Sequence, residues 1–103
     1  MCGIAGFAGA GQGALEDRAA LQRMIGTLHH RGPDGHGFHV APGVGLAHAR
    51  LAIIDLATGQ QPLHDGHETV WTVFNGEIFN YVELRDELER QGYHFRTRSD
   101  TEV

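Results

Sequence analysis

The only cysteine of this 103-residue chain, Cys2, directly follows the initiator Met1. Removal of Met1 would leave a thiol and a free α-amino group on the same residue. An α-amino group is partly unprotonated near neutral pH, so it can accept the proton of the thiol without a histidine partner. Cysteine also occurs at position 2 by chance, so the residues that accompany Cys2 must decide whether it is a nucleophile.

The composition is that of an ordinary globular protein and excludes several functional classes. Apolar residues make up 41% and charged residues 20% of the chain, which argues against a disordered tail or a membrane span. The net charge of −5, without any basic run, does not fit a nucleic-acid surface. A single cysteine cannot form an internal disulfide, and the first residues lack the features of a signal peptide. We therefore expect a cytoplasmic protein without a nucleic-acid or membrane partner.

The first half of the chain predicts an amphipathic helix on an antiparallel sheet. Residues 4–8 form a short apolar run followed by a glycine-rich turn at 9–13. The apolar residues Leu21, Met24, Ile25 and Leu28 recur at helical spacing, which predicts a helix over about 15–29. After a polar loop at 30–37, we expect strands at 38–41 and 44–49, joined by a turn at Pro42 and Gly43, and a third apolar strand at 51–56.

The second half predicts one long strand and one helix. Residues 69–74 alternate β-branched and aromatic types, which favours a central strand that ends at Asn75 and Gly76. Asn80 and Glu83 have the spacing of a capping box and open a helix that stops at Gly92. A short strand at 94–97 should follow, and Ser99 with Glu102 resembles the start of another helix. Because that helix would have one turn only, we expect the sequence to be truncated.

Two motifs have alternative interpretations. Asn75-Gly76 is a strong signal for a type I′ hairpin turn when it is considered alone. The pairs His36/His39 and His64/His67 have an i, i+3 spacing that two zinc ligands could use, with Cys2 or His94 as a third. No Cys-x-x-Cys pair accompanies them, so we predict no metal site.

Five blocks of residues, in order along the whole chain, carry a resemblance to a known family. They are residues 1–6 (MCGIAG), 30–34 (HRGPD), 46–55 (LAHARLAIID), 75–80 (NGEIFN) and 99–102 (SDTE). The chain resembles the class II glutamine amidotransferase domain, an N-terminal nucleophile hydrolase, and within that family the asparagine synthetases. The narrower resemblance depends on residues 31–34 and also covers related synthetases that use another acceptor. Phe79 stands where the family pattern has tyrosine.

The resemblance implies a role for each candidate site residue. Cys2 would attack the side-chain amide of glutamine, and the Asn75 amide with the Gly76 backbone N–H would stabilise the oxyanion. Arg50 would bind the substrate α-carboxylate, and Glu77 and Asp100 would accept hydrogen bonds from its ammonium group. Arg31 and Asp34 would shape the pocket without taking part in bond making.

The resemblance also implies a fold and partners. It predicts an α+β fold, the N-terminal part of a four-layer α/β/β/α sandwich of antiparallel sheets, over residues 1–103. The expected function is the glutaminase step of an asparagine synthetase, with ATP and Mg²⁺ needed only in a synthetase domain that these residues lack. That domain normally lies in the same chain, and a homodimer is left open. The alternatives are an amidotransferase with another acceptor and a non-catalytic glutamine- or metal-binding fragment, and we expect the isolated 103 residues to have little activity.

Overall fold

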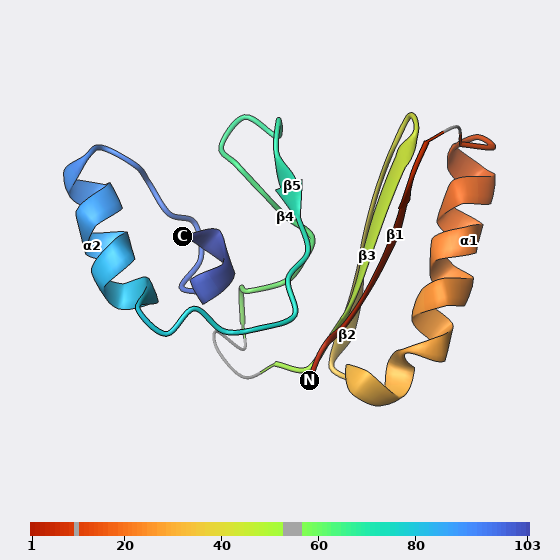
Figure 1. Ribbon diagram of the computed structural model, residues 1–103, viewed down its shortest axis with the longest axis horizontal. Helices are drawn as coiled ribbons and strands as arrows, with labels where there is room; N and C mark the ends of the chain where they lie inside the picture. The colour runs from red at the N-terminus through yellow and green to blue at the C-terminus, as the bar shows by residue number, and fades with distance from the viewer. Residues whose placement is uncertain (10, 53–56) are drawn as a thin grey trace.

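The computed structural model describes residues 1–9, 11–52 and 57–103. The chain has two helices, five strands and two short 3₁₀ turns among these residues, arranged as Figure 1 shows. In chain order they are β1 (Gly3–Ala8), α1 (Ala14–Thr27), η1 (His29–Arg31), β2 (Gly35–Ala41), β3 (Val44–Arg50), β4 (Leu63–His64), β5 (Trp71–Thr72), α2 (Tyr81–Arg90) and η2 (Asp100–Glu102).

The first half forms an antiparallel three-stranded sheet in the order β1-β3-β2. The hairpin of β2 and β3 turns at Gly43, whose φ of 76° suits glycine. In the register, Gly3 lies opposite Ala49 and Ile4 opposite His48. Because side chains alternate between the faces of a strand, Ala47 and Ala49 face one side, whereas His48 and Arg50 face the other. The strands expected at 4–8, 38–41 and 44–49 are confirmed, although β2 begins three residues earlier.

Helix α1 covers the face of the sheet that carries the two alanines (Figure 1). Leu21 and Ile25 are fully buried against Ala47 and Ala49, and the small alanines allow the helix to approach the sheet closely. Met24, expected in the same apolar stripe, is 38% exposed. The helix is followed by the η1 turn, so residues 29–31 are helical rather than part of a loop.

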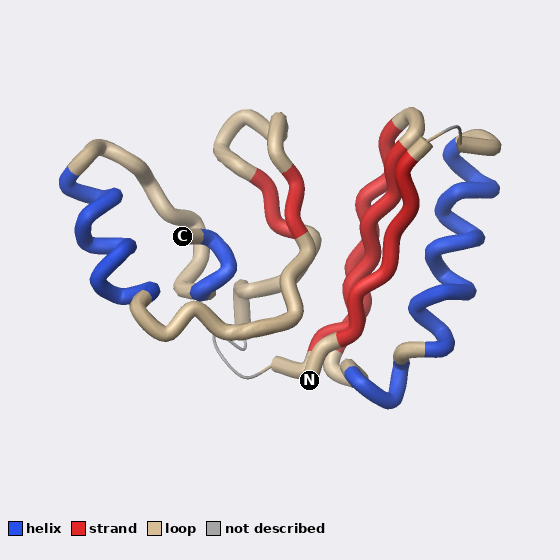
Figure 2. The backbone as a smooth tube through the Cα atoms, viewed as in Figure 1, coloured by secondary structure: helices blue, strands red, loops and turns tan. Residues whose placement is uncertain are grey.

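The opposite face of this sheet lies toward the β4–β5 ribbon, with α2 beyond it (Figures 1 and 2). His39 on β2 stacks on Trp71 of β5 with ring centroids 3.7 Å apart. A Cβ atom on Gly37 would lie 1.7 Å from the carbonyl oxygen of Gln61, so only glycine permits this approach. The chain therefore builds two antiparallel sheets in contact, the larger covered by a helix.

The long central strand predicted at 69–74 is wrong, since only Trp71 and Thr72 pair as β5. The N–H groups of Thr69 and Val70 donate to the Asp65 carboxylate at 2.6 and 3.1 Å. The N–H of Phe74 donates to the side-chain oxygen of Gln61 at 2.6 Å. Side-chain acceptors thus occupy donors that a longer ladder would need. Asn75-Gly76 does not join two strands among the described residues, so the hairpin interpretation is also wrong.

The strand predicted at 94–97 is absent for the same physical reason. The Glu102 carboxylate accepts from the N–H groups of Arg96 and Thr97 at 2.8 and 2.6 Å. Glu102 therefore does not complete a capping box with Ser99, although the Ser99 side chain accepts from the N–H of Thr101. The resulting η2 is a single 3₁₀ turn.

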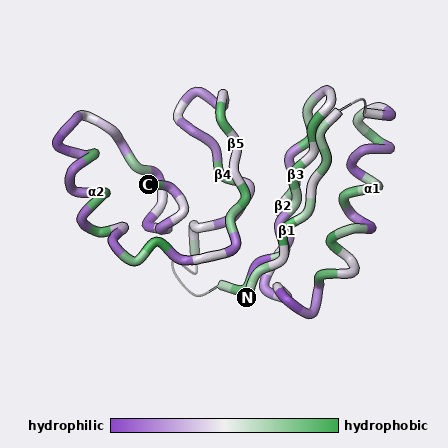
Figure 3. The backbone as a smooth tube through the Cα atoms, viewed as in Figure 1, coloured by the Kyte–Doolittle hydropathy of each residue, from purple (hydrophilic) through white to green (hydrophobic). Residues whose placement is uncertain are grey.

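Helix α2 begins and ends close to its predicted limits, but the predicted capping box is wrong. Asn80 makes no side-chain cap hydrogen bond. At the other end Gly92 has a φ of 97°, and the N–H of Tyr93 donates to the carbonyl of Leu88. Both long helices alternate between hydrophilic and hydrophobic segments, as Figure 3 shows.

Two further expectations concern the remaining segments. The apolar strand predicted at 51–56 falls largely outside the described residues, and Leu51 and Ala52 are not in a strand. Within the described ranges, neither helix has the length and apolar character needed to cross a bilayer.

Candidate active site

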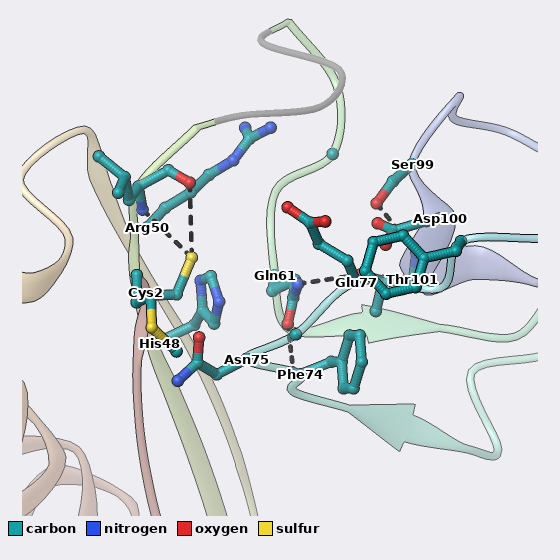
Figure 4. Close-up of a pocket in the computed structure, with 15 residues that line it drawn as sticks. Cys2, His48, Arg50, Gln61, Phe74, Asn75, Glu77, Ser99, Asp100 and Thr101 are labelled. Carbon is teal, nitrogen blue, oxygen red and sulfur yellow. Dashed lines mark hydrogen bonds between the residues drawn. The ribbon is translucent and has the colours of Figure 1, made fainter. Parts of the chain in front are cut away.

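A pocket of about 340 Å³ lies where the end of the three-stranded sheet meets the segments after β5 and the η2 turn (Figure 4). Six predicted site residues line it together: Cys2, Arg50, Asn75, Gly76, Glu77 and Asp100. Residues from both ends of the sequence therefore converge on one cavity. Their proximity is a structural finding, whereas their individual roles stay predictions.

Cys2 lies immediately before β1, at the edge of the pocket. Its Sγ accepts a hydrogen bond from the N–H of Leu51 at 3.3 Å and lies 3.5 Å from the carbonyl oxygen of the same residue. The Nε of Arg31 donates to the carbonyl oxygen of Cys2 at 3.2 Å. Met1 also lines the pocket and is 70% exposed, so its removal would open space directly beside the thiol.

Arg50 is the last residue of β3 and is buried on the pocket side of the sheet. It lies two positions after His48, so both side chains leave the same face of the strand. A guanidinium at this place provides a fixed positive charge and a planar set of donors at the wall of the cavity.

The opposite wall carries the acidic residues. Asp100 is 5% exposed, and its Oδ2 accepts from the N–H of Ile78 at 2.8 Å. This bond joins the η2 turn to the segment that bears Asn75, Gly76 and Glu77. Figure 4 shows Glu77 and Asp100 across the cavity from Cys2. The pocket therefore has a thiol at one side and carboxylates at the other.

Arg31 and Asp34 lie outside the residues that line this pocket. Asp34 lines a neighbouring cavity, and its Oδ2 accepts from the N–H of Ala52 at 2.8 Å. Its own N–H donates to the Arg50 carbonyl at 2.9 Å. The Arg31 side chain thus holds the backbone of Cys2, and Asp34 holds the backbone at Arg50 and Ala52, which is compatible with the predicted pocket-shaping role.

The sequence prediction assigned no role to several residues that line the pocket, among them His48, Gln61, Phe74, Ser99 and Thr101. The side chain of Gln61 accepts from the N–H of Phe74 and donates to Oγ1 of Thr101 at 3.2 Å. It therefore joins three segments of the wall, and no local pattern predicts this. His48 could have been found, because strand alternation places it on the face that carries Arg50.

His48 is the most buried of these polar residues, with 1% of its surface exposed. Burial lowers the pKa of its imidazole; the Phe74 backbone opposes this shift, and the positive charge of Arg50 adds to it. The ring is therefore neutral at neutral pH, with one nitrogen as a donor and the other as an acceptor.

The histidine pairs considered as zinc ligands do not converge. His36 and His39 lie on opposite faces of β2, and His39 stacks on Trp71. His64 lies 3.6 Å from the Glu68 carboxylate. Nowhere in the described ranges do three histidine, cysteine or acidic side chains gather as a metal-binding group.

Comparison with known proteins gives a consistent result. The family model of the glutamine amidotransferase domain matches residues 1–103. The chain is 46% identical over 105 residues to asparagine synthetase [glutamine-hydrolyzing] 1 of Bacillus subtilis (strain 168) and 43% identical over 103 residues to asparagine synthetase [glutamine-hydrolyzing] of Zea mays. These alignments cover 100% of this chain and 17% of each relative.

A third relative, asparagine synthetase [glutamine-hydrolyzing] of Sandersonia aurantiaca, is 44% identical over 103 residues, which are 100% of this chain and 19% of that protein. The chain thus spans less than a fifth of the length of these relatives. The family match extends over the whole sequence, and the pocket unites residues from four of the five sequence blocks. The chain therefore belongs to the glutamine amidotransferase domain family.

Proposed function

We propose that this chain hydrolyses the side-chain amide of glutamine to glutamate and ammonia, with Cys2 as the nucleophile after removal of Met1. The observation that carries the proposal is the convergence of Cys2, Arg50, Asn75 and Asp100 on one pocket. These residue types are what amide hydrolysis of an amino acid needs: a thiol, an oxyanion donor and charges that hold the two ends of the zwitterion.

In the proposed reaction, the Cys2 sulfur bonds to the amide carbon while the α-amino group of the same residue takes the thiol proton. The amide oxygen becomes an oxyanion that accepts hydrogen bonds from Nδ2 of Asn75 and the N–H of Gly76. The carbon–nitrogen bond then breaks, and the leaving nitrogen takes the proton from the α-amino group and departs as ammonia. Water attacks the thioester and releases glutamate, which restores the thiol.

The amino-acid end of glutamine needs charges fixed at a distance from the reacting carbon. Arg50 is placed to bind the α-carboxylate with two parallel N–H donors, and Glu77 with Asp100 is placed to accept from the ammonium group. The hydrogen bond between Asp100 and the N–H of Ile78 keeps one carboxylate oxygen in place. This charge pattern favours a free amino acid over a peptide or a simple amide.

We further propose that the ammonia serves an asparagine synthetase reaction, because the similar proteins carry that name. Residues 1–103 would be the N-terminal portion of a longer amidotransferase domain, joined in the same chain to a synthetase domain that uses ATP and Mg²⁺ to amidate aspartate. The succession of α1, two antiparallel sheets and α2 supports the four-layer α/β/β/α sandwich for the whole domain. A homodimer and a cytoplasmic location stay predictions.

The test uses the full protein that contains these residues, expressed so that Met1 can be removed. Mass spectrometry should find Cys2 at the N-terminus, and the protein should release glutamate from glutamine. Cys2→Ala should abolish this release and leave ammonia-dependent amidation intact. Retention of Met1 together with full glutaminase activity would falsify the mechanism.

The acceptor is tested separately, with ammonia and ATP supplied. Formation of asparagine from aspartate supports the synthetase assignment. If a different acceptor stimulates glutamine hydrolysis, the glutaminase assignment stands and the asparagine synthetase assignment is replaced by a synthetase for that acceptor. Glutamine binding without any glutamate release would instead support the non-catalytic alternative.

A further inference from the structure

His48 is the histidine of the described chain whose two ring nitrogens are both buried and unsatisfied. Neither ring nitrogen makes a hydrogen bond of good geometry among the described residues, although the Phe74 backbone lies near enough to oppose the lowering of the ring's pKa by burial. Leaving a buried polar atom without a partner destabilises the folded state. Such a cost is tolerated where the partner is supplied at a functional step, and His48 lines the candidate active site.

The position of His48 identifies the group that could become its partner. Cross-strand register places it opposite Ile4 of β1, two positions after Cys2, and opposite Gly37 of β2, which has no side chain to cover the ring. Figure 4 shows the imidazole between the side chains of Cys2 and Asn75, with the Asn75 carboxamide oxygen turned toward the ring. Among the described residues, the Asn75 carboxamide makes no hydrogen bond to another side chain.

A carboxamide that stabilises an oxyanion must present its NH₂ group and not its oxygen. Free rotation about the last torsion of asparagine places either group toward the substrate, so a hydrogen bond to the oxygen is needed to select one orientation. A neutral imidazole has one N–H donor suited to this task. Its burial favours a single ring position, because the surrounding sheet leaves little room for rotation.

We propose that His48 is a positioning residue: in the glutamine-bound pocket its ring N–H donates to Oδ1 of Asn75 and thereby directs Nδ2 of Asn75 at the oxyanion. This inference rests on the proposed glutaminase function and adds a residue to it. His48 acts through Asn75 and takes no proton from Cys2. Its loss should therefore lower kcat for glutamine hydrolysis and leave KM for glutamine nearly unchanged.

The test is a double-mutant cycle of His48→Leu and Asn75→Ala in the full protein that contains this chain. Removal of an oxyanion donor lowers kcat roughly 100- to 1,000-fold. Because His48→Leu would leave the Asn75 donor in place but misdirected, it should lower kcat by about 10- to 100-fold. In the Asn75→Ala background the same substitution should change kcat by less than about two-fold. His48→Gln, which keeps an N–H donor, should restore most of the activity.

The rate at which iodoacetamide alkylates Cys2 shows whether His48→Leu has disturbed the structure around the thiol. Alkylation forms no oxyanion on an amide, so its rate should be the same in wild type and His48→Leu. His67→Leu, at an exposed turn position, is the matched control and should leave kcat unchanged. If His48→Leu lowers kcat by the same factor in the wild-type and Asn75→Ala backgrounds, the inference about His48 is overturned while the proposed function stands. Absence of glutamate release by the wild-type protein would overturn the proposed function as well.

Discussion

Nε of Arg31 donates a hydrogen bond to the backbone carbonyl of Cys2 at 3.2 Å. This bond links the η1 turn at the end of α1 to the residue that carries the thiol. Since the N–H of Leu51 also donates to the Cys2 sulfur, Cys2 is held through both its backbone and its side chain. Attack on an amide carbon requires such placement, because small displacements of a nucleophile reduce the rate strongly.

Arg31→Met should lower kcat for glutamine hydrolysis by about ten-fold with little change in KM, because Cys2 loses one of its anchors while the residues that bind glutamine stay in place. Steady-state glutaminase kinetics measure both constants. Arg23→Met removes an exposed arginine from α1 and serves as the control. A rise in KM with unchanged kcat would indicate that Arg31 contacts the substrate instead.

Arg50→Lys should raise KM for glutamine by about 10- to 100-fold, because an ammonium group cannot form two parallel hydrogen bonds to a carboxylate. The inhibition constant of glutamate, which carries the same α-carboxylate, should increase to a similar extent. Under the proposed function, ammonia-dependent amidation by the full protein does not use this pocket, so it provides the control. An unchanged KM would remove Arg50 from the proposed binding set.

Gly37→Ala should lower the free energy of unfolding by about 1 to 3 kcal/mol, because the added Cβ would clash with the backbone oxygen of Gln61. Gly35→Ala, in the same strand, is the matched control: no atom lies within 4 Å of its added Cβ. Chemical unfolding compares the two variants. Equal stability of both would show that the strand and the segment at Gln61 are not in close contact.

His48→Gln should make the stability of the protein less sensitive to acid. Burial lowers the pKa of His48 in the folded state, so the unfolded chain binds this proton more readily. The contribution to stability is complete above the ordinary histidine value of about 6.5 and decreases as the pH falls below it.

Thermal unfolding from pH 7.5 to 5 measures this effect, with the wild-type curve falling more steeply than that of His48→Gln. The other histidines are common to both proteins, so the difference between the curves isolates His48. Parallel curves would contradict a buried neutral imidazole.

Local signals in the sequence predicted the parts of the fold that depend on neighbouring residues. The turn at Pro42 and Gly43, the apolar spacing of Leu21 and Ile25, and the glycine at position 92 each correspond to a feature of the structure. The predictions failed where a side chain, and not a neighbouring strand, accepts from the backbone donors. Gln61 takes the N–H of Phe74, and Glu102 takes those of Arg96 and Thr97, so two predicted strands are shortened or lost.

The sequence by itself determined the residue types for the chemistry, their order and, through the five blocks, the family. Only the tertiary structure decided that Cys2 and Asp100 line the same pocket, that Gln61 joins three segments of its wall, and that the ring of His48 is buried there without a well-formed hydrogen bond. The physical reason is that periodicity and turn signals act over a few residues. The pocket depends on the packing of the first sheet against segments that follow it by tens of residues.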